Sequence, residues 1–438
     1  SITSKKVKKN NIFFAIKGKK NDGNSFVKES FNKGASIAIV NKKNKFSPKK
    51  KQLLVKNSLK SLTNISEKLR LLSSAKIIAI TGSCGKTSLK ELLAKSLGKI
   101  GNVSSSPKSY NNKYGVPLSL FNINRHDDFG VFEVGMNRTG EIDYLSRIIK
   151  PDIAVITNIS YAHIKNFKNL NEIAEAKSEI IGNVNKNGSI VLNADDDFFY
   201  KHKKMSLGNG LKVYSFSLNK NTADVYLKKV LKMKNKFKII VNAHSKNKVF
   251  FVKSIFSSNL KNILAAITVI SIFTKVQEIN KNIFYELKNP EGRGDISKIK
   301  IKNKTIKFID ESYNANPLSV STAIKNYDLL KKGIGKKNLL LSDMLELGKY
   351  SRKLHEKLAE DINSSKIDNV FVYGKSIKHT FKNINFEKRG LILKNKDEII
   401  NLIKNNINNN DYLMFKGSNL TGLNDLAKNL KKGSFNAL

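Results

Sequence analysis

Hydrophobic runs alternate with polar stretches along this chain at intervals that predict strands and helices in turn. The apolar runs 12–16 and 35–40 predict two strands, and the periodic pattern over 26–33 between them predicts a helix. The lysine-rich stretch 42–51 predicts a solvated loop. Residues 1–75 are therefore expected to form a small α/β domain.

The longer middle part shows a regular exchange of strand and helix patterns. Strands are predicted at 76–80, 130–134, 152–157 and 189–193, with helices between them, which is typical of a parallel sheet. Shorter alternating strands within 211–252 predict an antiparallel insert or edge, and a helix over 259–274 closes the region. The segment 290–294, Pro-Glu-Gly-Arg-Gly, predicts a hinge.

Beyond the hinge, predicted strands at 307–310, 338–341, 369–373 and 412–415 alternate with helices in a Rossmann-like pattern. The sequence thus predicts an α/β protein with three domains, at 1–75, 76–294 and 295–438. A chain of 438 residues is long enough for more than one hydrophobic core, which agrees with this division.

The strand predicted at 76–80 leads directly into Thr81-Gly-Ser-Cys-Gly-Lys-Thr87 and then into a helical pattern. Glycines at 82 and 85 let backbone N–H groups turn inward around phosphate oxygens, and the following helix N-terminus adds partial positive charge. The usual phosphate-loop pattern places a glycine where this chain has Ile80, so this is a shortened variant. We expect ATP or GTP to contact Gly82, Ser83, Cys84, Gly85, Lys86 and Thr87, with Lys86 on the terminal phosphates and Thr87 on Mg²⁺.

The net charge of +45, from 80 Lys and Arg against 35 Asp and Glu, raises the question of a nucleic-acid partner. Lysine is spread along the whole chain, arginine is scarce, and no nucleic-acid-binding motif is present. This distribution indicates a general compositional bias, so we expect a small anionic substrate and no nucleic acid.

Several classes of protein are excluded or disfavoured by simpler features. No apolar run approaches the roughly 20 residues of a membrane span, and no signal-peptide pattern opens the chain, so we expect a cytoplasmic protein that does not insert into membranes. The single cysteine, Cys84, rules out an intramolecular disulfide. We further expect a monomer.

Polar residues stand at the ends of predicted strands, where open α/β sheets place their sites. Glu133 lies in an otherwise apolar strand, and a buried carboxylate needs a partner such as Mg²⁺. Asn158 ends the next strand, and His163 follows in the loop. Lys177 lies on a predicted helix between glutamates. Spacing alone favours ordinary surface roles for His163 and Lys177.

Longer motifs change that interpretation. They occur at 81–87, 104–118, 132–142, 157–164, 174–177, 292–294, 310–317 (Asp-Glu-Ser-Tyr-Asn-Ala-Asn-Pro), 343–348 (Asp-Met-Leu-Glu-Leu-Gly) and 416–418 (Lys-Gly-Ser). In order and spacing they resemble the Mur ligases, the ATP-dependent amide-forming enzymes of peptidoglycan synthesis. The motifs at 312–317 and 343–348 are similar to those of the branch that adds D-alanyl-D-alanine. The resemblance covers nearly the whole chain.

The resemblance implies ATP and Mg²⁺ as cofactors, and UDP-N-acetylmuramoyl-tripeptide and D-alanyl-D-alanine as substrates. It also implies domain roles: uridine-nucleotide binding by 1–75, ATP binding by 76–294, and dipeptide binding and closure on ATP by 295–438. The peptide carboxylate would attack the γ-phosphate, and the dipeptide amine would then attack the resulting acyl phosphate.

The same resemblance implies roles for particular residues. Lys86 would hold the β- and γ-phosphates, Thr87 and Glu133 one Mg²⁺, and His163 a second. Lys177 matches a lysine that these ligases carry as a carbamate, which serves as an anionic metal ligand. A nucleotide clamp would come from Asn259, Arg293 and Asp310, and substrate contacts from Ser4, Tyr110, Asn111, Asn112, Asn137, Asn314, Asn316, Lys416 and Ser418.

The chain departs from the family pattern at two places. Where an Asp-Ser/Thr-Arg motif is expected near the start, this chain has Ile2-Thr3-Ser4-Lys5, and only Ser4 matches. Where relatives have His-Asn before the domain-closing helix, it has Ser258-Asn259.

Two alternatives stay open at this point. The first is an amide ligase of the same superfamily that acts on another amino acid or on folate; the Asp-Asn-Pro-Arg motif of the ligase that adds the third residue is absent here. The second is a phosphate-loop motor or nucleic-acid ATPase, for which polynucleotide-stimulated, salt-sensitive hydrolysis is expected.

Overall fold

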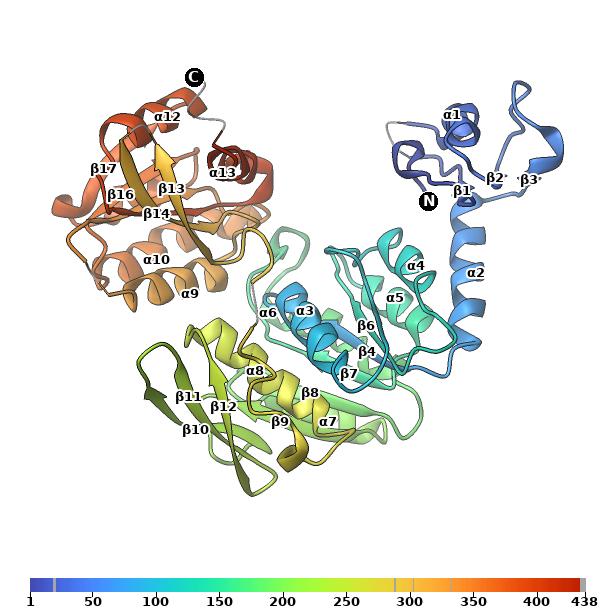
Figure 1. Cartoon of the computed structure of the whole chain (residues 1–438), viewed down its shortest axis with the longest axis horizontal. Helices are drawn as coiled ribbons and strands as arrows, with labels where there is room; N and C mark the ends of the chain where they lie inside the picture. Colours follow the sequence, from blue (N-terminus) through green and yellow to red (C-terminus); the bar gives the residue numbers. More distant parts are fainter. Residues whose placement is uncertain (19–20, 287–288, 302, 332, 434–438) are drawn as a thin grey trace.

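The computed structural model describes residues 1–18, 21–286, 289–301, 303–331 and 333–433. Over these residues the chain forms three β-sheets in sequence order, with three, nine and six strands. Figure 1 shows the N-terminal part in blue and the C-terminal part in orange and red, on opposite sides of the central part. The predicted α/β fold class is confirmed.

The N-terminal sheet is parallel, with the order β1-β2-β3 (Ile12–Phe14, Ile37–Val40, Gln52–Leu54). Helix α1 (Val27–Asn32) lies between β1 and β2, so the two predicted strands and the helix are confirmed. Helix α2 (Ser58–Leu71) leads away from this sheet and packs on α4 and α5 of the central part (Figure 1).

Strand β3 is not predicted by the sequence, because it is short and its side chains Leu53 and Leu54 are 56% and 54% exposed. The lysines of the predicted loop 42–51 are exposed, as expected. The loop is nevertheless anchored, since Gln52 Nε2 donates to the carbonyl oxygens of Asn44 (3.0 Å) and Ser47 (3.1 Å) and the loop ends in a 3₁₀ turn at Lys49–Lys51.

The central sheet has the order β12-β11-β10-β9-β8-β7-β4-β6-β5. It is parallel from β5 to β10, and the β10-β11-β12 edge is antiparallel. The predicted antiparallel edge within 211–252 is therefore confirmed for β10 to β12, whereas β9 in the same segment pairs in parallel with both of its neighbours. The strands are β4 (Lys76–Thr81), β5 (Val103–Ser105), β6 (Phe129–Glu133), β7 (Ile153–Ile156), β8 (Ser189–Asn193), β9 (Lys212–Ser217), β10 (Val225–Lys232), β11 (Phe237–Ala243) and β12 (Lys246–Val252).

Helices cover both faces of this sheet, which explains the continuous apolar sequence of β4. Successive side chains of a strand point to opposite faces. Ile77 and Ala79 pack in one cluster with residues of α5 and α6, and Ile78 and Ile80 in another with residues of α3 and α8. The helices are α3 (Lys86–Leu97), α4 (Gly115–Leu120), α5 (Glu141–Ile149), α6 (Leu170–Ser178), α7 (Phe199–Gly208) and α8 (Ser257–Ile270).

The C-terminal sheet has the order β13-β14-β18-β15-β16-β17 and is parallel except for the β13–β14 hairpin. Its strands are β13 (Asp295–Ile301), β14 (Lys304–Glu311), β15 (Lys337–Ser342), β16 (Asn369–Tyr373), β17 (Arg389–Leu393) and β18 (Tyr412–Lys416). The helices are α9 (Pro317–Asp328), α10 (Ser351–Asn363), α11 (Lys378–Asn383), α12 (Lys396–Asn405) and α13 (Leu423–Lys431).

The four strands predicted in this part are confirmed, whereas β13 and β17 are not predicted. Both lie at the edges of the sheet. In β13, lysines alternate with isoleucines, and in β17 most side chains are exposed, so neither strand has the apolar run that identifies an interior strand.

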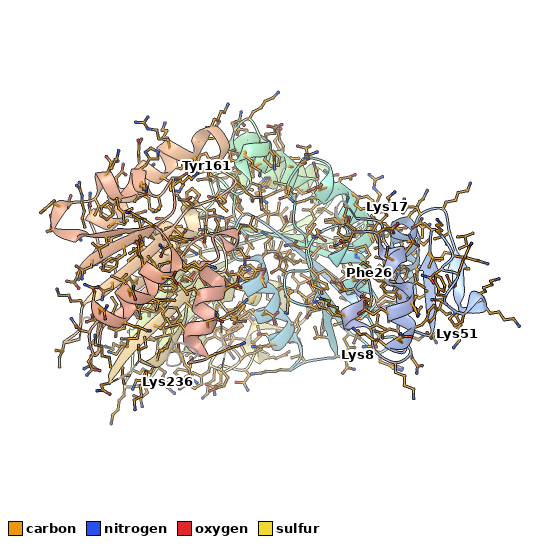
Figure 2. All side chains as sticks on the ribbon, turned by 90° about the horizontal axis from the view of Figure 1, so that it is seen from above. Lys8, Lys17, Phe26, Lys51, Tyr161 and Lys236 are labelled. Atoms are coloured by element: carbon orange, nitrogen blue, oxygen red, sulfur yellow. The ribbon has the colours of Figure 1, made fainter. Side chains whose placement is uncertain are left out.

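Lysines lie in parts of the molecule that are far from one another. Figure 2 shows Lys51 in the N-terminal part and Lys236 in the central part at opposite ends of the molecule. Among the residues that the structure describes, no helix is long and apolar enough to cross a membrane.

Candidate active site

The carboxyl ends of the central and C-terminal parallel strands meet at one cavity of about 870 Å³. Its central wall includes residues that follow β4, end β6 or follow β7, among them Lys86, Glu133 and Asn158. Its C-terminal wall includes Glu311 at the end of β14 and Lys416 at the end of β18. The cavity therefore lies where open α/β sheets bind ligands, and two separate sheets contribute to it.

The loop between β4 and α3 has the backbone of a phosphate loop. Gly82 has φ +140°, and a Cβ there would lie 1.9 Å from Thr157 Oγ1, so only glycine fits. Gly85 has φ +83° and precedes the first residue of α3. Thr157 Oγ1 donates to the carbonyl oxygen of Cys84 (2.6 Å), and the Cys84 N–H donates to Asn158 Oδ1 (3.0 Å). The end of β7 thus holds the loop in its shape.

A buried cluster of oxygen atoms lies beside this loop. Glu133 is 2% exposed, and its carboxylate accepts hydrogen bonds from Thr87 Oγ1 (2.6 Å) and Asn111 Nδ2 (2.6 Å). Arg293 Nη2 donates to Thr87 Oγ1 (3.0 Å), and the hydroxyls of Thr87 and Ser109 lie 3.1 Å apart. Arg293 comes from the predicted hinge segment, so that segment reaches the phosphate loop directly.

Two lysines on the central wall have few protein partners. Lys86 Nζ donates to the carbonyl oxygen of Gly82 (2.7 Å), and Lys177, which is 2% exposed, has no hydrogen-bond or ion-pair partner among the described residues. Burial lowers the pKa of Lys86, although the nearby negative charge of Glu133 acts to raise it. Burial, reinforced by repulsion from Lys86, holds the pKa of Lys177 well below its usual range. Lys177 is therefore suited to carry a neutral amine at the cavity wall.

His163 joins the central part to the C-terminal part. Its Nδ1 lies 2.5 Å from Glu346 Oε2, and the neighbouring imidazole keeps the pKa of Glu346 below its usual range. Both residues have left-handed backbones, with φ +60° at His163 and +64° at Glu346. Next to them, the Lys165 N–H donates to the carbonyl oxygen of Glu346 (3.0 Å). The contact leaves Nε2 of His163 for other partners.

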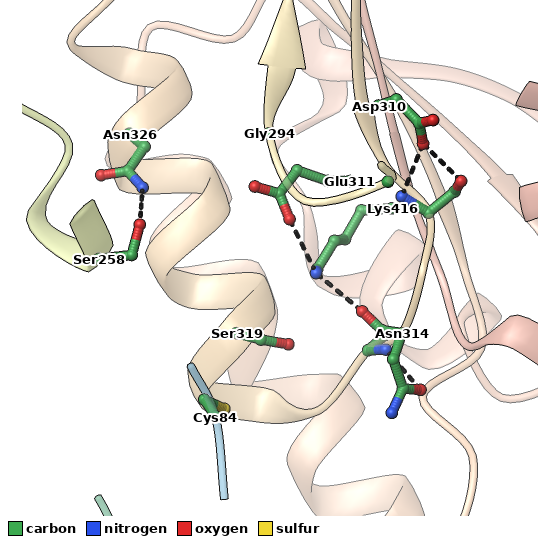
Figure 3. Close-up of polar contacts among 12 residues, drawn as sticks. Cys84, Ser258, Gly294, Asp310, Glu311, Asn314, Ser319, Asn326 and Lys416 are labelled. Carbon is green, nitrogen blue, oxygen red and sulfur yellow. Dashed lines mark hydrogen bonds and ion pairs between the residues drawn. The ribbon is translucent and has the colours of Figure 1, made fainter. Parts of the chain in front are cut away.

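The C-terminal wall consists of polar groups that are already paired (Figure 3). Lys416 is 3% exposed, and its Nζ lies 3.2 Å from Glu311 Oε2 and 2.8 Å from the carbonyl oxygen of Asn314. Gly294 has φ +90°, and a Cβ there would lie 2.7 Å from Glu311 Oε1. Gly294 therefore leaves the space in which the Glu311 carboxylate sits.

Side chains from the two walls also touch each other. Cys84 Sγ lies 3.1 Å from Asn316 Nδ2, at the start of α9. The Tyr313 hydroxyl donates to Ser109 Oγ (2.9 Å), and Asn326 Nδ2 of α9 donates to Ser258 Oγ of α8 (3.3 Å; Figure 3). These contacts join the two walls in this structure.

The structure brings most of the predicted site residues to this cavity. The lining includes Ser83, Cys84, Gly85, Lys86, Thr87, Asn111, Asn112, Glu133, Asn137, His163, Lys177, Asn259, Arg293, Asn314, Asn316, Lys416 and Ser418. Four predicted residues lie elsewhere. Gly82 shapes the phosphate loop from behind, Ser4 Oγ donates to Glu29 in the N-terminal part (2.9 Å), and the Tyr110 hydroxyl accepts from Lys6 Nζ (3.4 Å). The fourth, Asp310, is buried and paired with Lys431 Nζ (2.6 Å).

The residues expected to hold Mg²⁺ fit one such ion in part. Thr87 and Glu133 supply adjacent hydroxyl and carboxylate oxygens, which are donors that Mg²⁺ accepts. Among the residues described, no group of three or more His, Cys, Asp and Glu side chains could hold a metal alone. Mg²⁺ usually completes its coordination with water and substrate phosphates, so this donor set suits an ion that arrives with a nucleotide.

Several residues of the cavity were not predicted from the sequence. Lys261 and Asn262 of α8 line it, and the Asn262 side chain faces Gly85. The Arg293 guanidinium lies over the Tyr313 ring, with Cζ of Arg293 4.3 Å from the centroid of that ring. Tyr313 and Ser109 are within motifs that the sequence analysis identified, but nothing in those motifs indicates that the two side chains meet.

The site's geometry agrees with comparisons to known proteins. The Mur ligase middle domain model matches residues 80–270, and the model described as Mur ligase, glutamate ligase domain matches 296–419. A curated relative from Rickettsia prowazekii, named UDP-N-acetylmuramoyl-tripeptide--D-alanyl-D-alanine ligase, is 34% identical over 95% of this chain and 91% of its own length. The chain therefore belongs to the Mur ligase family, whose members are ATP-dependent amide ligases.

Solved structures show the same relationship across all three parts of the chain. MurF from Acinetobacter baumannii superposes with a TM-score of 0.85 at 26% identity, covering 99% of this chain and 93% of that one. MurF from Thermotoga maritima, solved in complex with ADP, has a TM-score of 0.83 at 26% identity and covers 99% and 97%. The similarity thus extends beyond the ATP-binding part to the whole chain.

Proposed function

We propose that this chain joins D-alanyl-D-alanine to the peptide carboxylate of UDP-N-acetylmuramoyl-tripeptide, with conversion of ATP to ADP and phosphate. One observation carries the proposal beyond nucleotide hydrolysis. The phosphate loop with Lys86 and Lys177 faces a polar wall from a second domain, with Asn314, Asn316 and Lys416, across one cavity. A ligase needs such an arrangement, because an acceptor must reach the activated group while water is kept out. Relatives of this chain over more than nine-tenths of its length carry that activity in their names.

In the first step the peptide carboxylate oxygen attacks the γ-phosphorus of ATP, an acyl phosphate forms, and ADP leaves. Phosphoryl transfer depends mainly on alignment and charge stabilisation. Lys86, at the N-terminus of α3, is placed to bind the terminal phosphates, and the backbone N–H groups of the phosphate loop to bind the others. Arg293 reaches the same loop through Thr87 and adds a second positive charge.

Mg²⁺ bound by Thr87 and Glu133 would neutralise charge on the transferring phosphoryl group. Lys177 has the environment that carbamate formation needs, since a neutral amine attacks CO₂ and then loses a proton. The resulting anion would turn an unpaired buried amine into an oxygen ligand. His163 is held by Glu346 through Nδ1, so its Nε2 is the nitrogen that can face a second metal ion.

In the second step the dipeptide amine attacks the acyl carbon, a tetrahedral intermediate forms, and phosphate leaves as the amide bond closes. The amine gives up protons in the process, one to become nucleophilic and one on amide formation. On the C-terminal wall, Lys416 donates to the Asn314 carbonyl, Ser418 donates to the Ala315 carbonyl, and Asn316 accepts from the Ser319 N–H. These bonds fix the positions of the groups, so the wall can hold the dipeptide against the acyl phosphate. We assign uridine recognition to residues 1–75, with Ser4 among the contacts.

A coupled assay of ADP release tests this function. We expect ADP release to require the UDP-muramoyl tripeptide and to continue over many turnovers only when D-alanyl-D-alanine is also present. The assay is repeated with tripeptides that differ in their third residue. As controls, glycine, L-alanine, glutamate or folate replaces D-alanyl-D-alanine in the assay, because other amide ligases act on an amino acid or on folate. Polynucleotide without these substrates should give no stimulation. ADP release that follows polynucleotide, or another amino acid in place of the dipeptide, would contradict the proposal.

A further inference from the structure

Lys90 is a completely buried lysine that does not line the cavity and belongs to none of the motifs discussed above. It lies on α3, one helical turn after Lys86. Burying an ammonium in a protein interior is costly unless each of its N–H groups has a partner. The partners of Lys90 therefore indicate what its charge is for.

Two of those partners are in the segment 106–111, from which Ser109 and Asn111 line the cavity next to the phosphate loop. Lys90 Nζ donates to the carbonyl oxygens of Ser106 (2.6 Å) and Lys108 (2.6 Å), and it lies 2.8 Å from Glu91 Oε1. An ammonium has three N–H donors, so these contacts use all of them. The two carbonyls flank Pro107, and Lys108 has a left-handed backbone with φ +48°. A left-handed backbone is energetically unfavourable for a non-glycine residue such as Lys108, and the hydrogen bond from Lys90 to its carbonyl stabilises that conformation.

The segment held by Lys90 in turn holds the oxygen cluster of the site. Ser106 Oγ accepts from the Glu133 N–H (3.2 Å), and Asn111 Nδ2 donates to Glu133 Oε1 (2.6 Å). Ser109 Oγ lies between Thr87 Oγ1 (3.1 Å) and the Tyr313 hydroxyl (2.9 Å). Lys90 therefore ties the helix that carries Lys86 and Thr87 to the backbone of the segment that orients Glu133, and the Thr87–Ser109 contact adds a side-chain link.

We propose that Lys90 is a positioning residue, which locks segment 106–111 to the phosphate-loop helix and so fixes Glu133 relative to Thr87. Its role in turnover rests on the proposed ligase function, but its role in ordering the segment does not. A lysine that only fills space in the core would stabilise the fold without a specific effect on the segment or on the reaction.

The experiment compares Lys90→Met with Lys337→Met. Lys337 is a matched control, because it is also completely buried and donates to a backbone carbonyl, that of Asp328 (2.9 Å), in the C-terminal part. Methionine keeps the length and apolar stem of lysine, so both variants lose mainly the ammonium. Hydrogen–deuterium exchange of the chain without substrates is measured on peptides covering 103–112.

We expect exchange over 106–111 to be about tenfold faster in K90M and unchanged in K337M, even where both variants melt at lower temperature. In the ligation assay K90M should lower kcat about tenfold and raise the Mg²⁺ concentration for half-maximal rate by a similar factor, while the KM for ATP changes little. Lys90→Arg, which retains a cation and several donors, should recover part of both effects.

Wild-type exchange over 106–111 in K90M would overturn the proposal, and so would faster exchange with unchanged kcat and Mg²⁺ dependence. If K90M does not fold, Lys90→Gln is measured in the same way, with the same two outcomes. A wild-type chain that performs no ligation would contradict the proposed function and leave the exchange result to decide on Lys90.

Discussion

The two walls of the cavity are built on similar parallel sheets but differ in how their charged groups are satisfied. On the central wall, Lys177 has no partner among the residues described, and Lys86 donates only to a carbonyl of its own loop. On the C-terminal wall, Lys416 is paired with Glu311 and with the carbonyl of Asn314. Lys86 and Lys177 on the central wall are thus available to bind a charged ligand. Lys416 on the C-terminal wall instead stabilises the arrangement of the groups around it.

This difference indicates a division of labour. Groups whose interactions form only with reacting phosphates stabilise the transition state, and their removal lowers kcat. Groups that are already paired contribute position and stability, and their removal has smaller effects. Variants of the unpaired groups should therefore lose more activity than variants of the paired ones.

The largest effect is expected for Lys177→Ala, which removes the buried amine. The variant should be nearly inactive, because it loses the side chain that becomes the anionic ligand, and acetate or formate should restore part of the activity. Lys201→Ala is the control, since Lys201 forms an exposed ion pair with Glu175 (2.8 Å). Full activity of Lys177→Ala without any additive would rule out the carbamate role.

Lys86→Ala should lower turnover by at least about 10²-fold while the fold is retained, because it removes a charge directed at the transferring phosphoryl group. Steady-state ADP release measures the loss, and circular dichroism checks the fold. Lys95→Ala, an exposed position on the same helix, should behave as wild type. Normal turnover of a folded Lys86→Ala would mean that the loop 81–87 does not bind the phosphates.

Arg293→Ala should weaken ATP use by about tenfold and reduce domain closure, because Arg293 contacts Thr87 from the hinge segment and stacks on Tyr313. We expect the wild-type chain to become more compact with nucleotide and UDP-muramoyl peptide, and the variant to do so less. Small-angle scattering with and without ligands measures this. Arg352→Ala, on an exposed face of α10, is the control. Equal radii of gyration for the wild type in both states would contradict a hinge.

The smallest effect is expected for Glu346→Gln, which weakens the contact with His163. The contact is partly exposed, so its loss should cost no more than about 1 kcal/mol. The pKa of Glu346 is lowered in the folded state, so its contribution is full above the unfolded pKa of about 4.3 and is lost as the pH falls through the folded value.

Melting temperatures of the wild type and Glu346→Gln should therefore differ at neutral pH and converge in acid. Glu356→Gln, at an exposed i,i+4 pair on α10, provides a comparison for a surface carboxylate. A difference that grows as the pH falls would show that the Glu346 carboxylate does not stabilise this contact.

Local sequence was sufficient for part of the central wall. The phosphate loop, Glu133 and the strand ends follow from short-range patterns, because a glycine turn between strand and helix has few alternatives. The neighbours that join the walls could not be predicted. His163 and Glu346 are far apart in sequence, and their contact depends on two left-handed residues that no periodicity indicates.

The burial of polar residues could not be predicted from local sequence either. Lys90 and Lys177 both lie on amphipathic helices, where a lysine is ordinarily placed on the solvent side. Only the fold shows that both are buried, with partners in one case and without in the other. Asp310 illustrates the converse, because the family resemblance implied a nucleotide contact, whereas its carboxylate is paired with Lys431.

The central claim is that the cavity transfers an acyl group from one wall to an amine held by the other. It is tested most directly with UDP-muramoyl tripeptide whose reacting carboxylate carries ¹⁸O, incubated with ATP, Mg²⁺ and D-alanyl-D-alanine. We predict that mass spectrometry will find the pentapeptide product and an equal amount of inorganic phosphate bearing one ¹⁸O from the carboxylate. ADP release without pentapeptide, or pentapeptide with unlabelled phosphate, would contradict the account.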